Sequence, residues 1–128
     1  GNYVGTISRR NLLRSGRKKV ILVDHNEKNQ AVNGIEDTEI LEIIDHHRLG
    51  PIQTITPVFF RNQPLGCTGT IIYKMYQETG ISIEPVIAGL MCSAIISDTL
   101  IFKSPTCTPG GGEAAKWLAY IAGSEADV

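Results

Sequence analysis

Short apolar runs separated by polar segments give this sequence the pattern of a parallel α/β fold. Residues 20–23 form a continuous apolar run, as expected for a strand that is covered on both faces, and the largely apolar residues 39–44 predict a second core strand. Residues 26–32 between them are expected to form a turn or two of helix within a right-handed crossover. A third strand is predicted over residues 53–60, where Pro57 indicates a sheet edge or a bulge.

Three later segments have the pattern of helices. Residues 66–70 begin a helix whose apolar positions fall on one face and which Gly80 ends. A second helix begins near Pro85 and is almost entirely apolar through residue 97, which predicts that it is buried. A third helix is expected over residues 113–122, after the loop-like run Gly110-Gly111-Gly112. Together these elements predict a Rossmann-like parallel sheet with flanking helices.

The first fifteen residues have a different pattern from the rest. Residues 2–7 alternate like a half-buried edge strand, and Ser8 is placed to cap a short helix over residues 9–13. A polar break follows, so we divide the chain into residues 1–15 and a main domain over residues 16–128.

Composition narrows the function classes. The 128 residues carry 13 acidic and 12 basic side chains, so charge alone does not favour nucleic acid binding. The three cysteines, Cys67, Cys92 and Cys107, are odd in number and unpaired in spacing, which favours reduced thiols in a cytoplasmic protein over a disulfide framework. The longest apolar run, residues 85–97, is too short to span a membrane.

Acidic and imidazole side chains stand where the apolar elements end. Asp24 follows the first strand, Asp45, His46 and His47 close the second, and Asp98 ends the apolar helix. A single Asp or His at such a position is most often a cap or turn residue. Ligands collect at the carboxyl ends of parallel strands, so three apolar elements that each end in an acid together favour a site for divalent metals. Asp24 and Asp98 can each bridge two hard ions, and a nitrogen from His46 would favour Mn²⁺ or Co²⁺ over Mg²⁺. The pattern is that of a metal-assisted hydrolase.

Other residues are candidates for contact with an anionic substrate. His47 would point away from His46 if the strand stays regular, but at a frayed strand end it could reach a phosphate. Arg48 and Lys103 could also contact an anion, although such side chains are often simply solvated. The helix start at residues 66–70 is either an ordinary Thr-capped end or a phosphate site.

At this point the sequence resembles a known family. Asp45-His46-His47 is the motif that names the DHH phosphoesterase superfamily. Residues 23–27 (V-D-H-N-E), 44–50 and 93–106 extend the likeness to the family II, manganese-dependent inorganic pyrophosphatases. The resemblance covers roughly residues 19–123, with three separate motifs in the same order.

The resemblance implies hydrolysis of pyrophosphate to two phosphates by a two-metal mechanism, with Mn²⁺ or Co²⁺ as cofactor and Mg²⁺ accompanying the substrate. It also implies a homodimer in the full-length protein, with no nucleic acid or membrane partner. The roles it assigns are metal binding by Asp24, His46 and Asp98, substrate contact by His47, and orientation of the histidines by Asp45. His47 therefore joins the three metal ligands as a catalytic candidate, and Arg48 and Lys103 join it on the substrate side.

Two parts of that family have no counterpart in this sequence. These are a first-strand motif of the form G-H-x-N-P-D-T-D-S and a second domain that supplies Lys and Arg to the substrate. Residues 1–15 resemble the tail of a CBS regulatory module, or form a linker. We therefore expect an internal piece of a regulated pyrophosphatase, an incomplete DHH domain that is inactive or weakly active alone. The alternatives are a phosphodiesterase for short oligonucleotides or cyclic dinucleotides, and a non-catalytic regulatory fragment.

Overall fold

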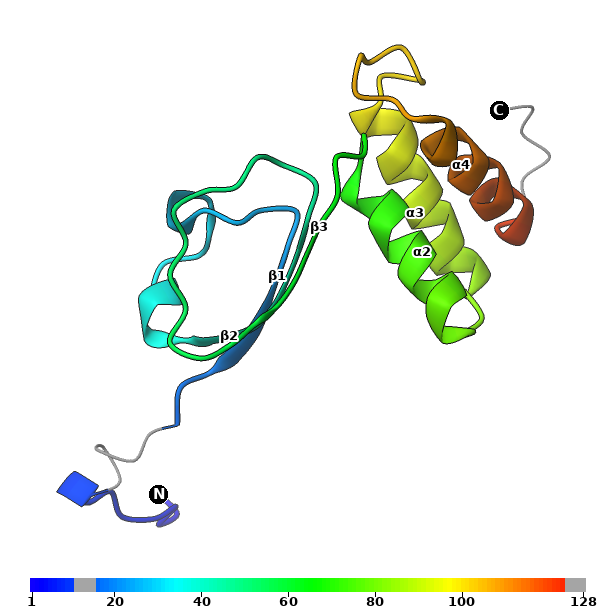
Figure 1. Ribbon diagram of the computed structural model, residues 1–128. Coiled ribbons are helices and arrows are strands. Elements are labelled where there is room, and N and C mark those ends of the chain that lie inside the picture. The colour runs from blue at the N-terminus through cyan, green and yellow to red at the C-terminus, as the bar shows by residue number, and fades with distance from the viewer. Residues whose placement is uncertain (11–15, 124–128) are drawn as a thin grey trace.

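The computed structural model describes residues 1–10 and 16–123, and it has the predicted α/β architecture. A parallel sheet forms one side of the molecule, and three helices pack side by side on the other (Figure 1). In chain order the elements are β1 (Lys19–Val23), η1 (Lys28–Gln30), η2 (Ile35–Asp37), β2 (Glu39–Asp45), β3 (Phe59–Asn62), α2 (Thr68–Thr79), α3 (Pro85–Asp98) and α4 (Pro109–Ile121).

The sheet has the order β1-β2-β3, and both strand pairs are parallel. Leu22 of β1 packs with Ile35, Ile40 and Ile43 in a small core on one face of the sheet. The other face of β1 is open in the described chain, because Ile21 and Val23 are 51% and 46% exposed. The prediction that the first strand is covered on both faces is therefore wrong for the described residues. β1 is an edge strand here, and β2 is the central one.

The connections differ from the predicted pattern in detail. The helix expected over residues 26–32 shrinks to the single 3₁₀ turn η1, and η2 adds a second turn after the left-handed Gly34. β3 begins only at Phe59, two residues beyond Pro57, and it forms the other edge of the described sheet. The strand predicted over residues 53–60 is therefore wrong for residues 53–58, and Pro57 lies outside the ladder, where a residue without an N–H does no harm.

The helices begin and end largely where punctuating residues predict. Gly80 ends α2 in a left-handed conformation at φ 68°, and Pro85 opens α3. Cys67, rather than a threonine, caps α2, because its sulfur accepts the Gly69 N–H. The expectation of a loop at residues 110–112 is wrong, since α4 begins at Pro109 and these glycines form its first turn.

Burial of the helices follows one face of each. Ala88, Cys92 and Ile95 of α3 pack against Leu118 and its neighbours on α4. The prediction that all of α3 is buried is wrong, since Val86 and Leu90 are 73% and 63% exposed. No helix in the described parts of the chain is both long enough and apolar enough to cross a membrane.

The prediction of a strand near the N-terminus is also wrong. Residues 2–7 form no strand, and residues 1–10 are exposed throughout. An isolated alternating segment has no neighbour here to supply ladder hydrogen bonds, so the pattern alone does not make a strand. The helix expected over residues 9–13 begins at residue 9, and its remainder lies outside the described residues.

Candidate metal centre

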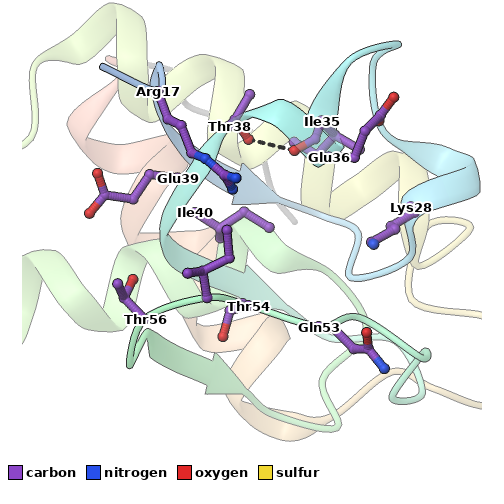
Figure 2. Close-up of a pocket in the computed structure, with 11 residues that line it drawn as sticks. Arg17, Lys28, Ile35, Glu36, Thr38, Glu39, Ile40, Gln53, Thr54 and Thr56 are labelled. Atoms are coloured by element: carbon purple, nitrogen blue, oxygen red, sulfur yellow. Dashed lines mark hydrogen bonds between the residues drawn. The ribbon is translucent and has the colours of Figure 1, made fainter. Parts of the chain in front are cut away.

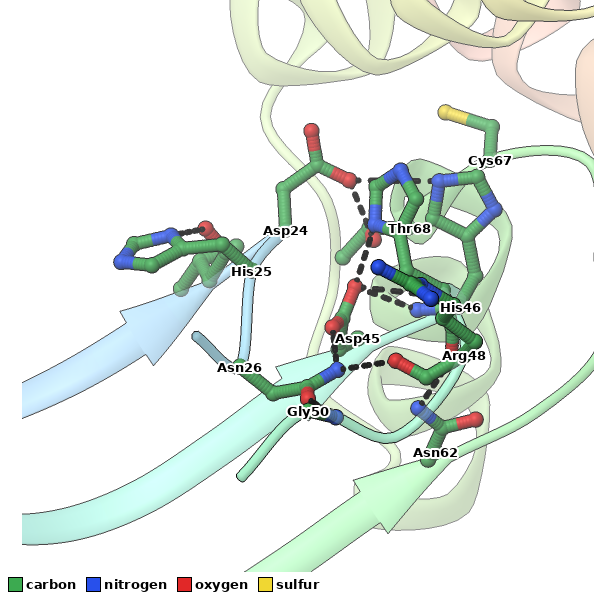
Figure 3. A network of polar contacts seen from close by, with 12 residues as sticks. Asp24, His25, Asn26, Asp45, His46, Arg48, Gly50, Asn62, Cys67 and Thr68 are labelled. Atoms are coloured by element: carbon green, nitrogen blue, oxygen red, sulfur yellow. Dashed lines mark hydrogen bonds and ion pairs between the residues drawn. The ribbon is translucent and has the colours of Figure 1, made fainter. Parts of the chain in front are cut away.

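Polar side chains gather at the carboxyl end of every strand (Figure 3). Asp24 follows β1, Asp45 ends β2, and Asn62, its partner in the sheet register, ends β3. Asp24 continues the sheet ladder by donating its N–H to the Ile44 carbonyl at 2.9 Å, while its own φ of 67° is left-handed. Asp tolerates this conformation better than most residues, so it fits the sharp turn at the end of the strand. The ends of the three described strands therefore bring these polar side chains to one edge of the sheet.

Asp45 is the buried centre of the cluster, with none of its surface exposed. Its Oδ1 accepts hydrogen bonds from the His46 and His47 N–H groups at 2.7 and 3.2 Å and from His47 Nδ1 at 2.8 Å. Its Oδ2 accepts from Asn26 Nδ2. Burial alone would raise the pKa of Asp45, but these hydrogen bonds outweigh burial and hold the pKa below its usual value. Asp45 is thus charged at neutral pH and serves as an acceptor, not as a metal ligand.

Two asparagines pin the loop that carries the histidines. Asn26 Nδ2 also donates to the Arg48 carbonyl at 3.0 Å, and Asn26 Oδ1 accepts the Gly50 N–H. Asn62 Nδ2 donates to the His47 carbonyl at 2.8 Å. The loop after β2 is therefore tied to the ends of both neighbouring strands. Sequence reasoning placed Asn26 only inside a motif and missed Asn62 altogether.

The two imidazoles are oriented in the same way. His46 Nδ1 lies 2.7 Å from the Leu65 carbonyl, and His47 Nδ1 lies 2.8 Å from Asp45. Because both partners only accept, each Nδ1 carries a proton and each neutral ring keeps its lone pair on Nε2. β2 ends at Asp45, so the regular alternation that would separate the rings is lost, and their centroids lie 4.2 Å apart.

Asp24, His46 and His47 form the group that could hold a metal. Their ligand atoms all lie within 4.8 Å of one another, and His46 Nε2 is 3.4 Å from Asp24 Oδ1. In the neutral ring, His46 Nε2 and Asp24 Oδ1 face each other with lone pairs, and neither atom has a proton to donate to the other. A divalent cation satisfies both atoms, and this mixed O/N donor set suits Mn²⁺ or Co²⁺. His25, next in sequence, points away from the group and bonds to the Val23 carbonyl (Figure 3).

Asp98 lies beside the group but is not one of its members. It is the last residue of α3 and is exposed. Burial raises the pKa of Cys67 to about 12, and the carboxylates of Asp98 and Asp24 add to that effect. Cys67 is therefore a protonated thiol at neutral pH. The structure brings Asp24, His46 and His47 together, and Asp98 is near the Cys67 thiol at the start of α2.

The predicted substrate contacts are more dispersed. Arg48 is 88% exposed and its guanidinium lies 3.4 Å from Glu27, so it already has an acidic partner. Lys103 is exposed in the segment after α3, which contains the left-handed residues Leu100, Ile101 and Phe102. Neither placement tests a substrate role. The phosphate site proposed for the start of α2 likewise stays a prediction.

A separate cavity of about 490 Å³ lies at the amino ends of β1 and β2, opposite the metal group (Figure 2). Arg17, Lys28, Glu36 and Glu39 line it together with several threonines. Its two basic and two acidic side chains balance, so it has no clear preference for an anion. The cavity is therefore not assigned to the chemistry of the strand ends.

Comparison with known proteins identifies the family. The chain is 58% identical over 120 residues to the cobalt-dependent inorganic pyrophosphatase of Clostridium perfringens (strain 13 / Type A). This match covers 94% of this chain and 22% of that protein. It is 57% identical over 108 residues to a Bacillus velezensis protein named as a manganese-dependent inorganic pyrophosphatase, and this match covers 84% of this chain and 35% of that protein.

A solved structure agrees in fold. A Methanococcus jannaschii protein, described as a family II inorganic pyrophosphatase, superposes with a TM-score of 0.81 at 42% identity and covers 87% of this chain and 39% of that one. The chain thus spans well under half the length of these relatives. The model for the N-terminal domain of the DHH family matches residues 2–95. The chain belongs to the DHH family.

Proposed function

We propose that this chain is the metal-binding portion of an inorganic pyrophosphatase that uses Mn²⁺ or Co²⁺ and hydrolyses pyrophosphate to two phosphates. One observation carries the proposal: ligand atoms of Asp24, His46 and His47 converge, while an acceptor oxygen holds the Nδ1 of each imidazole. The names of the similar proteins, which specify manganese and cobalt, support the same choice of metal. Bound ions would polarise a phosphoryl oxygen and lower the pKa of a bound water.

The proposed roles are those that the family resemblance implies, and the placement of Asp24, His46 and His47 supports them. Asp24, His46 and Asp98 serve as metal ligands in this proposal, and Asp45 fixes the imidazoles. His47, whose ring centroid lies 4.2 Å from that of His46, contacts the pyrophosphate, and Arg48 and Lys103 are further cationic contacts. His47 is also positioned to act as a ligand, because one of its ring nitrogens belongs to the same group of converging atoms.

The proposal includes a larger protein around the chain. The 120-residue match is only 22% of the C. perfringens relative, whereas 108 residues are 35% of the B. velezensis relative, so the former is much the longer protein. Residues 1–15 are proposed as the tail of a CBS-like module or a linker, and residues 16–128 as the DHH domain. We further propose a cytoplasmic homodimer without nucleic acid or membrane partners. The near balance of acidic and basic residues and the open edge of β3 support this arrangement.

Titration calorimetry with Mn²⁺ tests the metal site in the chain itself. The wild-type chain is expected to bind Mn²⁺, and Asp24→Ala and His46→Ala are expected to abolish the heat of binding. His25→Ala is the matched control, because this neighbouring imidazole points away from the group. Identical titrations for wild type and both site variants would refute the proposed site. Circular dichroism of each variant shows whether the fold is retained.

A further inference from the structure

One short segment, residues 65–68, contacts two of the three side chains proposed as metal ligands. The Leu65 carbonyl accepts the His46 Nδ1–H at 2.7 Å, and Thr68 Oγ1 donates to Asp24 Oδ1 at 2.8 Å. His46 lies in the loop after β2 and Asp24 at the end of β1, so the segment is the place where these separate elements meet.

Each contact restricts a rotation of a proposed ligand side chain that would otherwise weaken metal binding. A carbonyl bonded to Nδ1 fixes both the tautomer and the plane of His46, which leaves Nε2 as the metal-facing atom. The Thr68 hydroxyl fixes the rotation of the Asp24 carboxylate, whose Oδ1 also faces His46 Nε2 at 3.4 Å. The side chain of Asp24 is 55% exposed, so few other contacts restrain it.

The segment itself is rigidly held. Cys67 is 2% exposed and its sulfur accepts the Gly69 N–H at 3.2 Å, which caps α2. A Cβ atom on Gly66 would lie 2.9 Å from Thr99 Cγ2 and 3.1 Å from the Thr106 carbonyl, so the backbone there is packed closely against the end of α3 and the segment that follows it. The contacts to the ligands are thus made from a fixed backbone.

We propose that residues 65–68 are the positioning element of the metal centre, with Thr68 orienting Asp24 and the Leu65 carbonyl orienting His46. These are positioning residues, because they act through the ligands and not on the metal or substrate. The inference rests on the proposed function for the identity of the metal. The orientation of His46 in the metal-free chain is independent of it.

Variants at Thr68 test the hydroxyl directly. Thr68→Val keeps the shape and removes the donor, so Mn²⁺ affinity by calorimetry is expected to fall by about 10- to 100-fold. Thr68→Ser restores the hydroxyl and is expected to restore the affinity, which a merely structural role for the methyl group would not do. Thr79→Val, at the other end of the same helix and bonded only to α2 carbonyls, is the matched control.

Nitrogen-15 NMR of the metal-free chain separates failure of this inference from failure of the proposed function. His46 is expected to show a protonated Nδ1 and an unprotonated Nε2 at a pH where the ring is neutral. The opposite tautomer would overturn the positioning role of Leu65, whatever the chain binds. Equal Mn²⁺ affinity in wild type and Thr68→Val would overturn the role of Thr68. A wild-type chain that binds no Mn²⁺ refutes the proposed function, and the tautomer then decides the positioning role alone.

Discussion

At the residue scale, the charge of Asp45 cannot be replaced by an amide of the same shape. Asn26 is fixed in orientation, because Nδ2 donates to the Arg48 carbonyl and Oδ1 accepts from Gly50. In Asp45→Asn, either the new NH₂ group faces the Asn26 NH₂ group or it replaces the oxygen that bonds the histidines. A buried donor without an acceptor costs about 1–3 kcal/mol. The free energy of unfolding, measured by urea denaturation, is expected to fall by about that amount.

The matched control for this prediction is Asp37→Asn. Asp37 is exposed in η2, so the same chemical change is expected to leave stability within about 0.5 kcal/mol of wild type. If Asp45→Asn were as stable as Asp37→Asn, the hydrogen-bond network drawn around Asp45 would be wrong.

Single residues at the site were predictable to different degrees. Asp24, His46 and His47 could be recognised because an acid or imidazole directly follows an apolar run, and strand ends meet at one edge. Thr68 could not be recognised from the sequence, since its role depends on a contact with Asp24, which lies 44 residues away in the sequence. The Leu65 contact uses a backbone carbonyl, which every residue has, so no residue type signals it.

At the scale of elements, the first turn of α4 is built from residues that disfavour helix. A Cβ on Gly112 would meet nothing within 4 Å, so Gly112→Ala is expected to raise the free energy of unfolding by about 0.5–1 kcal/mol. The gain comes from the lower backbone entropy of alanine in the unfolded chain. Thermal and urea denaturation of the two proteins measure it.

Gly80→Ala supplies the opposite expectation at the end of α2. Space is also open there, but φ is 68°, and a left-handed conformation costs a residue with a Cβ about 1–2 kcal/mol. A stabilising Gly80→Ala or a strongly destabilising Gly112→Ala would contradict the backbone conformations described for these helix ends.

An ion pair joins β3 to α2 and gives stability a dependence on pH. Arg61 binds the two carboxylate oxygens of Glu78, with Nη2 2.7 Å from Oε1. The hydrogen bond to Arg61 lowers the pKa of Glu78 below its usual value. Folding therefore favours the charged form, and the stabilisation is present at neutral pH and lost as pH falls below about 4.3.

The expected result is a stability difference between wild type and Glu78→Gln that is present at pH 7 and shrinks toward pH 3. Added salt is also expected to reduce the difference, because Glu78 is exposed. Urea denaturation over this pH range measures it. A difference that grows toward low pH would show that the pair does not stabilise the charged carboxylate.

Element types were easier to predict than their limits. Gly80 and Pro85 give local backbone signals, and the helix boundaries at these residues agree with prediction. The start of α4 does not, because local propensity assigns the glycine run to a loop. Gly111 is buried, and an added Cβ would lie 3.7 Å from Thr108 Oγ1 and 3.9 Å from Thr70 Oγ1, so packing near α2 decides the conformation.

At the scale of the whole molecule, the sequence pattern indicates which faces are apolar, but it does not indicate which segments cover those faces. This is why β1 and α3 were predicted to be fully buried, although Ile21 and Leu90 are 51% and 63% exposed in the described chain. The relatives are far longer, since the chain spans 22–39% of their length. The stability and activity measured for this chain are therefore those of only one part of the architecture of its relatives.

The last prediction concerns catalysis by that part. Pyrophosphate is highly charged, and catalysis of phosphoryl transfer consists mainly of positioning and cationic stabilisation. The described metal group contains three side chains, and Arg48 is already paired with Glu27, so the chain alone offers few fixed cationic contacts. Removing one such preorganised contact costs about 10²–10³ in rate, so absence of two or more predicts a loss of at least about 10⁴-fold.

A graft provides the matched comparison. The aligned 120-residue segment of the C. perfringens relative, 58% identical, can be replaced by this chain, and phosphate release measured at equal Mn²⁺ or Co²⁺ concentrations. The graft is expected to hydrolyse pyrophosphate, and Asp24→Ala in the graft is expected to abolish this activity. The isolated chain is expected to show at least about 10⁴-fold lower turnover. Comparable turnover per site would mean that the remaining protein supplies no contact essential for catalysis. A folded graft that cleaves short oligonucleotides but not pyrophosphate would instead favour a phosphodiesterase, because the metal group would be intact while the substrate assignment was wrong.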